Sequence, residues 1–455
     1  MLAGDAHLTV ILGAGASVPS GLPTWDQFAR RLAVISGLVK TEDAARTLLR
    51  KQDPTIVLEA VRSRSGARWS ANLDSALYGG LADDPEPSPL HLAAAGHYLA
   101  SPRATTLATL NFDTLLESAI LSTGAREVVA RLAEEFDPKT EDLAVHHLHG
   151  AVLGGRAYSP VVGYRDFAEL VADDHAWQHT FLRHALERGP LLLAGTSYRD
   201  PDIRHWLHLV VRDERPRYPA LVTIVREGLA LDRQTFEEID EALAFEWESI
   251  GLRALRMHDL ADIALVLREL RFIGEPAYRA PNERARQVWD SHARRFRRLQ
   301  REYSELLAKD AATITKALGA PAHRGTLWLA NARGKLARWA TEGIVHGSVR
   351  DLKLVPTGHD SPWIAGEAIG AEGVKVRDVE REQRVTPTWR SVLAVPVFVG
   401  DGELPDFTCA VLTFGLAQSA GSVVSQQERW WHTVEELSDA WGGRLSGVAF
   451  SPRHP

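Results

Sequence analysis

The chain has 455 residues, of which 45% are hydrophobic and 24% are charged, and its formal net charge is −7. This composition is typical of a folded protein with two to four domains, and it excludes a disordered or fibrous chain. The small negative charge excludes a general coating of nucleic acid.

Cysteine usage and hydropathy limit the class of protein further. Cys409 is the single cysteine, so neither an intrachain disulfide nor a zinc site built from several cysteines can form. Scarce cysteine fits a reducing compartment, and we expect a cytoplasmic protein. Residues 1–10 lack a basic segment and no run of about 18 apolar residues occurs, which predicts neither a signal peptide nor a membrane span.

Five short apolar runs predict the strands of an N-terminal α/β domain. The first run, residues 7–12, ends in a glycine-rich turn, and a helix with one apolar face follows from Trp25 to Val39. Helical stretches separate most of the other runs, which cover residues 105–110, 143–148, 191–194 and 220–225. Alternation of helices with almost continuously apolar strands favours a parallel, doubly wound sheet.

A loss of periodicity near residue 274 predicts a domain boundary, because residues 274–281 hold two prolines. Residues 282–309 then predict one long arginine-rich helix with heptad spacing of large side chains. Three interpretations of this helix stay open: a solvated helix packed on its own domain, a dimerising signalling helix, or a nucleic-acid contact. We assign residues 1–273 to the first domain and residues 274–324 to a linker with this helix.

The remaining residues, 325–455, predict an α+β domain with an antiparallel sheet. A helix is expected over residues 326–343. The clearest strand-like segments cover residues 391–398 and 409–414, and a closing helix is expected over residues 426–440.

The first motif with chemical content is Gly13-Ala14-Gly15-Ala16-Ser17, directly after a predicted strand. Glycines let a backbone approach a ligand closely, and a helix that follows such a turn can hold phosphate at its N-terminus. A tight structural turn explains the motif equally well. The spacing departs from Gly-x-Gly-x-x-Gly, so the standard dinucleotide fingerprint is not present.

Two further motifs also follow predicted strands, at the edge where open α/β sheets bind ligands. In the segment from Thr109 to Asp113, the Asn111 amide and the Asp113 carboxylate can both reach a ligand or cap a helix. The segment from Gly195 to Asp202 places small hydroxyls where ribose or phosphate could bind. It can also start a capped helix at Ser197 or Asp200.

A cluster of histidines lies in the third predicted strand and just after it, at His146, His147 and His149. No second group of His, Cys, Asp or Glu at ligand spacing accompanies it, so we expect no metal site. His149 precedes Gly150 at a strand end and is the best candidate for a general base.

Taken in order, the four motifs resemble the sirtuin family. The series is Gly-Ala-Gly-Ala-Ser at 13–17, Thr-x-Asn-x-Asp at 109–113, His-Gly at 149–150 and Gly-Thr-Ser at 195–197. The phrase Gly-Leu-Pro-Thr-Trp at 21–25 is similar to the bacterial sirtuin-like domains of antiphage defence, as in Thoeris-type effectors. The resemblance covers about residues 1–273 and implies a Rossmann-like fold with an NAD site.

The same resemblance implies roles for individual residues, with NAD as substrate and no metal. Asn111, Asp113 and His149 would be catalytic. The residues expected to bind NAD are Gly13, Ala14, Gly15, Ser17, Trp25, Gly195, Ser197 and Asp200.

The chain also departs from deacylating sirtuins. It cannot build their four-cysteine zinc module, and Thr24-Trp25-Asp26 stands where they carry Asp-Phe-Arg. The defence branch is associated instead with hydrolysis of NAD. We therefore expect an NAD glycohydrolase that yields nicotinamide and ADP-ribose, as a regulated effector of abortive infection. The alternatives are a sensor that binds NAD or ADP-ribose without turnover, and a deacylase or ADP-ribosyltransferase.

Residues 325–450 resemble a GAF domain, on the strands Val392–Phe398 and Ala410–Phe414 and the closing helix. Such a unit serves either as a sensor or as a scaffold for oligomerisation. Because unregulated NAD loss would kill the host, we expect the C-terminal part to hold the enzyme off. A partner protein or a nucleotide signal would release it, and a homo-oligomer is expected.

Overall fold

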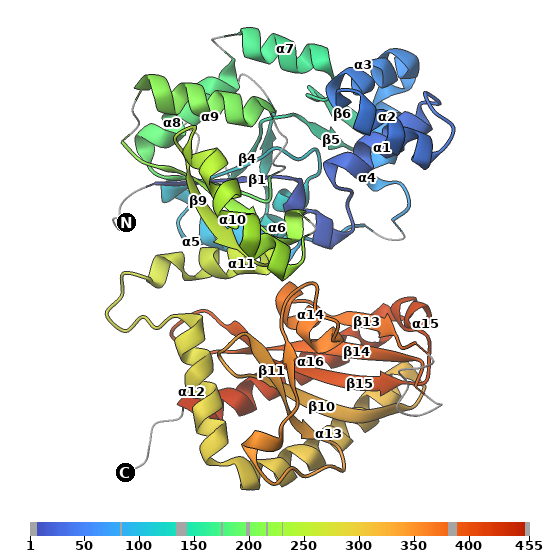
Figure 1. Cartoon of the computed structure of the whole chain (residues 1–455), viewed down its shortest axis with the longest axis vertical. Coiled ribbons are helices and arrows are strands. Elements are labelled where there is room, and N and C mark those ends of the chain that lie inside the picture. Colours follow the sequence, from blue (N-terminus) through green and yellow to red (C-terminus); the bar gives the residue numbers. More distant parts are fainter. Residues whose placement is uncertain are drawn as a thin grey trace. The chain divides into compact units, whose positions relative to one another are not determined.

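The computed structural model of the chain describes residues 7–81, 84–132, 143–173, 176–196, 201–214, 217–229, 231–380 and 389–450. The chain divides into two compact units, Met1–Arg268 and Glu269–Pro455, and Figure 1 shows the elements of each.

The first unit is built on a seven-stranded parallel sheet with the order β3-β4-β2-β1-β7-β8-β9. Its strands are β1 (Leu8–Leu12), β2 (Thr105–Thr109), β3 (Val129–Arg131), β4 (Ala144–His147), β7 (Leu191–Ala194), β8 (Ala220–Val225) and β9 (Arg253–Met257). The chain builds one half of the sheet from β2, β4 and β3 and the other half from β7 to β9. This confirms the predicted doubly wound sheet, and it puts a topological switch point beside β1, where ligands bind in such folds.

Helices cover this sheet on both faces (Figure 1). They are α5 (Pro89–Ala100), α6 (Leu115–Ser122), α7 (Tyr164–Ala172), α8 (Trp177–Arg188), α9 (Pro201–Glu214), α10 (Arg233–Glu248) and α11 (Leu260–Glu269). One core cluster joins Ile11 of β1 to Phe181 of α8 and Trp206 of α9. A small hairpin, β5 (Ala151–Leu153) with β6 (Arg156–Tyr158), follows β4.

A group of four helices lies between β1 and β2: α1 (Trp25–Ile35), α2 (Glu42–Lys51), α3 (Pro54–Ser65) and α4 (Trp69–Tyr78). Helix α1 starts at a capping box between Thr24 and Gln27, which satisfies free backbone N–H groups of its first turn. The group has its own core around Phe28, Leu32 and Val61, and this core includes Phe112 from the loop after β2. The four helices are thereby packed against a loop that bears candidate site residues.

The second unit is an antiparallel six-stranded sheet with the order β12-β11-β10-β15-β14-β13. Its strands are β10 (Ala322–Ala330), β11 (Lys335–Thr341), β12 (Leu354–Pro356), β13 (Lys375–Asp378), β14 (Ser391–Val399) and β15 (Phe407–Leu416). Its helices are α12 (Pro281–Arg294), α13 (Phe296–Leu318), α14 (Ile364–Ala371), α15 (Ala420–Val424) and α16 (Gln427–Phe450). Helices α13 and α16 pack on one face and α14 on the other, which confirms the predicted antiparallel α+β arrangement.

Two expectations for this part of the chain are wrong. Residues 326–343 are not a helix but most of the hairpin β10–β11, whose turn is held by the Asn331 side chain accepting from the backbone N–H groups of Arg333 and Lys335. Residues 282–309 are not one helix, because the chain leaves helical geometry at Arg295 (φ −107°, ψ 16°) and starts a second helix at Phe296.

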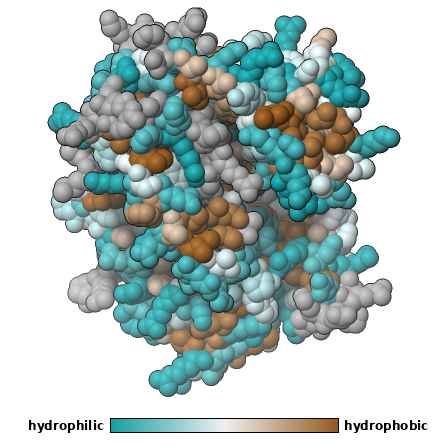
Figure 2. All heavy atoms as spheres, turned by 45° about the horizontal axis from the view of Figure 1, so that its top comes forward, coloured by the Kyte–Doolittle hydropathy of each residue, from teal (hydrophilic) through white to brown (hydrophobic). Residues whose placement is uncertain are grey.

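None of the described helices is long and apolar enough to cross a membrane. Large hydrophobic side chains that stay exposed include Ile56, Phe245, Ile273 and Val345. Figure 2 shows one face, on which hydrophobic groups form separate patches among hydrophilic side chains.

Candidate active site

Two loops meet closely at the carboxyl ends of β1 and β7. The Gly13 N–H donates to Ala194 O at 2.9 Å, and the Gly15 N–H donates to Gly195 O at 2.7 Å. A Cβ on Gly13 would lie 2.6 Å from the Thr196 Cα, and one on Gly195 would lie 2.8 Å from the Ala16 N. Gly195 also has a φ of +67°, which L side chains rarely adopt. These glycines therefore let the loops pack backbone to backbone beside the switch point.

Asn111 follows β2 and joins this loop to the next motif. Its Nδ2 donates to Gly13 O at 3.1 Å and to Ser17 Oγ at 2.9 Å. Both amide hydrogens are thus used, and the side-chain oxygen is the group of Asn111 that can accept a hydrogen bond from a ligand or water.

Asp113 receives a hydrogen bond at each carboxylate oxygen. Ser17 Oγ donates to Oδ2 at 2.8 Å, and the Leu115 N–H donates to Oδ1 at 3.1 Å. Burial raises the pKa of Asp113, although these two hydrogen bonds oppose the rise. The carboxyl group is therefore held in place while its ionised form is disfavoured by the apolar surroundings.

Ser17 has a further buried partner that the sequence analysis missed. His91 Nε2 lies 3.4 Å from Ser17 Oγ, and the Ser88 N–H donates to His91 Nδ1 at 3.2 Å. Because Nδ1 accepts, Nε2 carries the proton and points it at Ser17. Burial lowers the pKa of His91 to about 4, so the ring is neutral at physiological pH. The signal in the sequence is Ser88-Pro89-Leu90-His91, a capping box at the start of α5.

A second missed group is the buried pair of Glu117 on α6 and His147 on β4. His147 Nε2 lies 2.6 Å from Glu117 Oε1, and Nδ1 lies 3.3 Å from Asn111 O. Burial alone lowers the pKa of His147, but the hydrogen bond and the charge of Glu117 outweigh it and raise the pKa. Both partner atoms are oxygens that accept hydrogen bonds, so the ring donates from both nitrogens and holds the backbone of Asn111 in place.

His149 lies just beyond β4 and is 5% exposed. Its ring packs edge-on against Trp206 of α9 and Phe167 of α7, with centroids 5.9 and 6.2 Å away. Gly150 follows with a φ of +79°, and a Cβ there would lie 2.3 Å from two carbonyl oxygens of the β6 end. The apolar rings and this glycine turn together fix the direction of the imidazole.

Asn111, Asp113 and His149 line one pocket, whose empty space, part of it open to solvent, is about 600 Å³. The other lining residues are Ala14, Ser17, Leu22, Pro23, Trp25, Phe28, Leu77, Leu110, Phe112, Val161 and Phe167. The pocket is therefore formed by the β1 and β2 loops, the helices that follow β1, and the segment after β4.

The residues expected from the sequence are placed as follows. Ala14, Ser17, Trp25, Asn111, Asp113 and His149 line this pocket. Gly13, Gly15 and Gly195 form the packed loops at its side. Ser197 and Asp200 lie outside the described residues.

The other two histidine positions of the cluster do not join the pocket. His146 packs against Phe181, with ring centroids 5.0 Å apart, and burial lowers its pKa to about 3. His147 is bound to Glu117 as described. The three histidines of the cluster therefore lie in three different environments.

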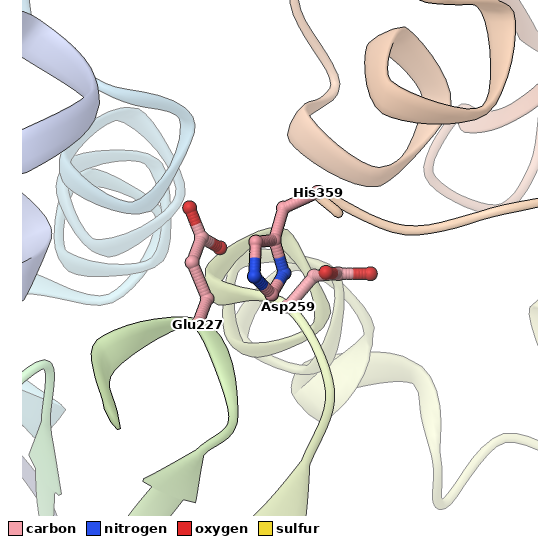
Figure 3. Close-up of side chains that lie close together, drawn as sticks. All are labelled: Glu227, Asp259 and His359. Atoms are coloured by element: carbon pink, nitrogen blue, oxygen red, sulfur yellow. The ribbon is translucent and has the colours of Figure 1, made fainter. Parts of the chain in front are cut away.

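Carboxylates also gather at the ends of β8 and β9. Leu260 N donates to Glu227 Oε2 at 2.9 Å, and Arg226 Nη2 lies 3.5 Å from Asp259 Oδ1. Figure 3 draws Glu227 and Asp259 together with His359. His359 belongs to the second unit, and the two units are not placed relative to one another.

Comparisons with known proteins bear on both units. Residues 105–255 match the family model of the SIR2-like domain. The solved structure of Sir2Tm bound to a propionylated peptide is 14% identical, with a TM-score of 0.26 over 58% of this chain and 91% of that chain. No curated protein matches the chain.

Solved GAF structures are similar to a smaller share of the chain. A GAF sensor protein from Burkholderia vietnamiensis is 15% identical, with a TM-score of 0.21 over 38% of this chain and 96% of that chain. A second GAF domain is 13% identical, with a TM-score of 0.22 over 37% and 98%.

The family match includes β2, with the Asn111 and Asp113 motif after it, and the segment of His149. A SIR2-like domain indicates NAD-dependent activity. Residues 105–255 of the first unit are thus similar to the SIR2-like domain, in agreement with the resemblance expected from the ordered motifs.

Proposed function

We propose that the first unit hydrolyses NAD+ to nicotinamide and ADP-ribose. The observation that carries this proposal is the convergence of Asn111, Asp113 and His149 on one pocket beside the glycine loops. At the switch point of such a sheet, the amide can orient water, the carboxyl can balance positive charge and the imidazole can accept a proton during a water-dependent cleavage of NAD.

The loops at the side of the pocket fit the dinucleotide part of NAD. Gly13 and Gly195 bring two backbone segments together at the carboxyl ends of β1 and β7, the edge at which such sheets bind ligands. Thr196 Oγ1 is buried there and has no hydrogen-bond partner among the described residues. A buried hydroxyl without a partner is costly, and a ribose or phosphate oxygen would satisfy it.

The chemistry is the cleavage of the bond between the nicotinamide nitrogen and ribose C1′. The bonding electrons leave with nicotinamide, which removes its positive charge, and the sugar passes through an oxocarbenium-like state. Water adds at C1′ and releases one proton. His149 accepts that proton, and the side-chain oxygen of Asn111 orients the water or the ribose hydroxyl.

Asp113 has a separate part in this proposal. Burial raises the pKa of Asp113, whereas a cationic nicotinamide ring beside it would favour the ionised form. Substrate binding therefore supplies the counter-charge that the buried carboxyl lacks, and Ser17 keeps it in position.

Product analysis tests the proposal. Purified protein is incubated with NAD+, and nicotinamide, ADP-ribose and cyclic ADP-ribose are separated. We expect nicotinamide and ADP-ribose in equal amounts from the wild type. Asn111→Ala and His149→Ala should each lower turnover by about 10²–10⁴-fold, the usual contribution of a positioned acid–base group. The matched control is His146→Ala, because His146 lies in β4, shortly before His149, but packs against Phe181 and does not line the pocket.

Other outcomes refute parts of the proposal. NAD+ that is bound but intact in every variant identifies a sensor, and acyl-ADP-ribose or ADP-ribosylated protein identifies a transferase. Wild-type turnover in either Asn111→Ala or His149→Ala removes the site assignment.

We also propose that the activity serves antiphage defence in the cytoplasm as a regulated homo-oligomer, on the resemblance to defence sirtuins. In infected cells, NAD+ should fall when the wild type is present and stay constant with Asn111→Ala. Equal NAD+ levels in the two strains would contradict this role.

A further inference from the structure

The backbone just before His149 is held by a side chain from another element. Strand β4 ends at His147, and in the next residue the Leu148 N–H donates to Thr109 O at 2.9 Å. The Leu148 carbonyl oxygen accepts instead from Gln178 Nε2 of α8, at 3.1 Å. The peptide that joins Leu148 to His149 is thus fixed through its oxygen by a glutamine that lies 30 positions further along the chain.

The packing of α8 places Gln178 for this contact. Gln178 is the second residue of the helix and is 5% exposed. Leu148 belongs to the core cluster that also contains Phe181 and Leu182 of the same helix. This core holds α8 against the segment that follows β4, so the amide reaches the carbonyl oxygen in a buried setting.

The other half of the Gln178 amide makes no hydrogen bond. Its Oε1 is buried and has no partner among the described residues. A buried acceptor without a partner lowers stability, and an apolar side chain of similar volume would avoid that loss. The polar side chain is therefore explained by the bond that Nε2 makes to Leu148 O and not by the stability of the core.

The same bond bears on the direction of the His149 ring. His149 O accepts from the Val161 N–H at 2.9 Å, so the two peptide groups beside the His149 Cα are held by Val161 and by Gln178. The ring itself contacts Trp206 and Phe167 edge-on, and contacts of this kind are worth only about 0.5–1.5 kcal/mol each. Because a side chain turns with the backbone that carries it, loss of the bond from Gln178 would let the imidazole turn between these two rings.

We propose that Gln178 is a positioning residue for His149, through its hydrogen bond to Leu148 O. The inference rests on the proposed function, in which His149 is the general base. Gln178 is not among the residues that line the pocket, so it acts on the base and not on NAD+. Loss of the bond should therefore slow the cleavage step and leave the binding of NAD+ unchanged.

The first variant, Gln178→Met, removes the donor and keeps the length of the side chain. A small displacement of a catalytic group lowers the rate strongly, so we expect kcat for NAD+ cleavage to fall by about 10–100-fold. KM should stay at the wild-type value, because the interaction with the base matters only in the transition state.

The second variant, Gln178→Glu, provides a rescue that depends on pH. A protonated carboxyl group can donate its O–H to Leu148 O, whereas an ionised one has no donor and repels that oxygen. The kcat of Gln178→Glu, relative to wild type at the same pH, should therefore be high at pH 5.5 and fall at pH 9. A role in packing alone predicts the opposite order of the two variants, because methionine suits a buried site better than a carboxyl group.

The matched control is Gln287→Met in the second unit. Gln287 Nε2 donates to Ala449 O at 3.1 Å, so this variant removes the same kind of bond at the same distance. Its kcat should equal that of the wild type. Thermal unfolding shows whether each variant is folded, and if Gln178→Met does not fold, Gln178→Glu at the two pH values carries the same test.

Nuclear magnetic resonance reads the direction of the His149 ring without turnover. In protein with isotope-labelled histidine, the ring signal of His149 is the one that His149→Ala lacks. Ring currents of Trp206 and Phe167 make this signal sensitive to orientation, since both rings lie next to the imidazole. We expect Gln178→Met to shift the signal and Gln287→Met to leave it in place.

The outcomes separate this inference from the proposed function. A wild type that does not cleave NAD+ refutes the proposed function, and the His149 signal then still decides whether Gln178 orients the ring. A Gln178→Met protein with the wild-type kcat, or with an unshifted His149 signal, overturns the inference. An equal loss of turnover in Gln287→Met overturns it as well.

Discussion

The buried pair of Glu117 and His147 holds the backbone of Asn111 in the candidate site. Replacing Glu117 by alanine tests this role. The side chains are 8% and 0% exposed. Removing one partner of such a pair leaves the other without compensation in an apolar setting. We expect the first unit to lose about 3–5 kcal/mol of unfolding free energy. Glu117→Gln keeps an acceptor but no charge, and should cost about 1 kcal/mol, the difference between charged and neutral hydrogen bonds.

The loss should depend on pH with a defined sign. The pKa of His147 is raised in the folded state, so its interaction with Glu117 stabilises the protein fully below the ordinary histidine pKa. This stabilisation is lost as the pH rises through the raised value. The difference between wild type and Glu117→Ala should therefore be larger at pH 6 than at pH 9.

Urea denaturation at the two pH values measures the effect. The two units are expected to unfold separately, so the first unit is followed by its own transition. Glu241→Ala on the exposed face of α10 is the matched control and should change stability by less than about 0.5 kcal/mol. Turnover should also fall in Glu117→Ala, because His147 holds the backbone of Asn111. A Glu117→Ala protein as stable as wild type at pH 6 would refute the role given to the pair.

Two more substitutions probe the loops and the carboxyl group. Gly195→Ala forces a side chain into a φ of +67° and brings its Cβ within 2.8 Å of Ala16 N. The left-handed backbone conformation alone lowers the stability of the alanine variant by about 1–2 kcal/mol. We expect calorimetry to find that the variant no longer binds NAD+. An unchanged affinity for NAD+ would contradict the close packing of the two loops. Asp113→Asn should abolish turnover yet gain stability relative to wild type as the pH rises from 5 to 8. The reason is that a buried carboxyl with a raised pKa loses stability on ionisation. Thermal unfolding at the two pH values measures the stability of Asp113→Asn relative to wild type. A stability gain of the same size at both pH values would contradict the raised pKa of Asp113.

The sequence by itself predicted the central strands of the first unit closely. The runs at 191–194 and 220–225 coincide with β7 and β8, because strands buried on both faces are continuously apolar. The edge strand β9 was missed. Its residues are only partly buried or exposed, so no apolar run marks it.

The hairpin in the second unit was missed for a different reason. Most of β10 is buried on both faces, and a bulge between Leu327 and Trp328 shifts its register against β11. The period of two that identifies a strand is therefore absent from residues 326–343, and the remaining spacing favours a helix.

For the candidate site too, some features follow from the sequence and others from the tertiary structure. The sequence determined which motifs follow strands, and parallel strands bring all such motifs to one edge of a sheet. Only the tertiary structure decided that Ser17 would donate to Asp113 across 96 positions. It also decided that His147 would bind Glu117 and would not line the pocket. Local patterns follow from the chemistry of neighbouring residues, whereas these contacts depend on packing between segments that are distant in the chain.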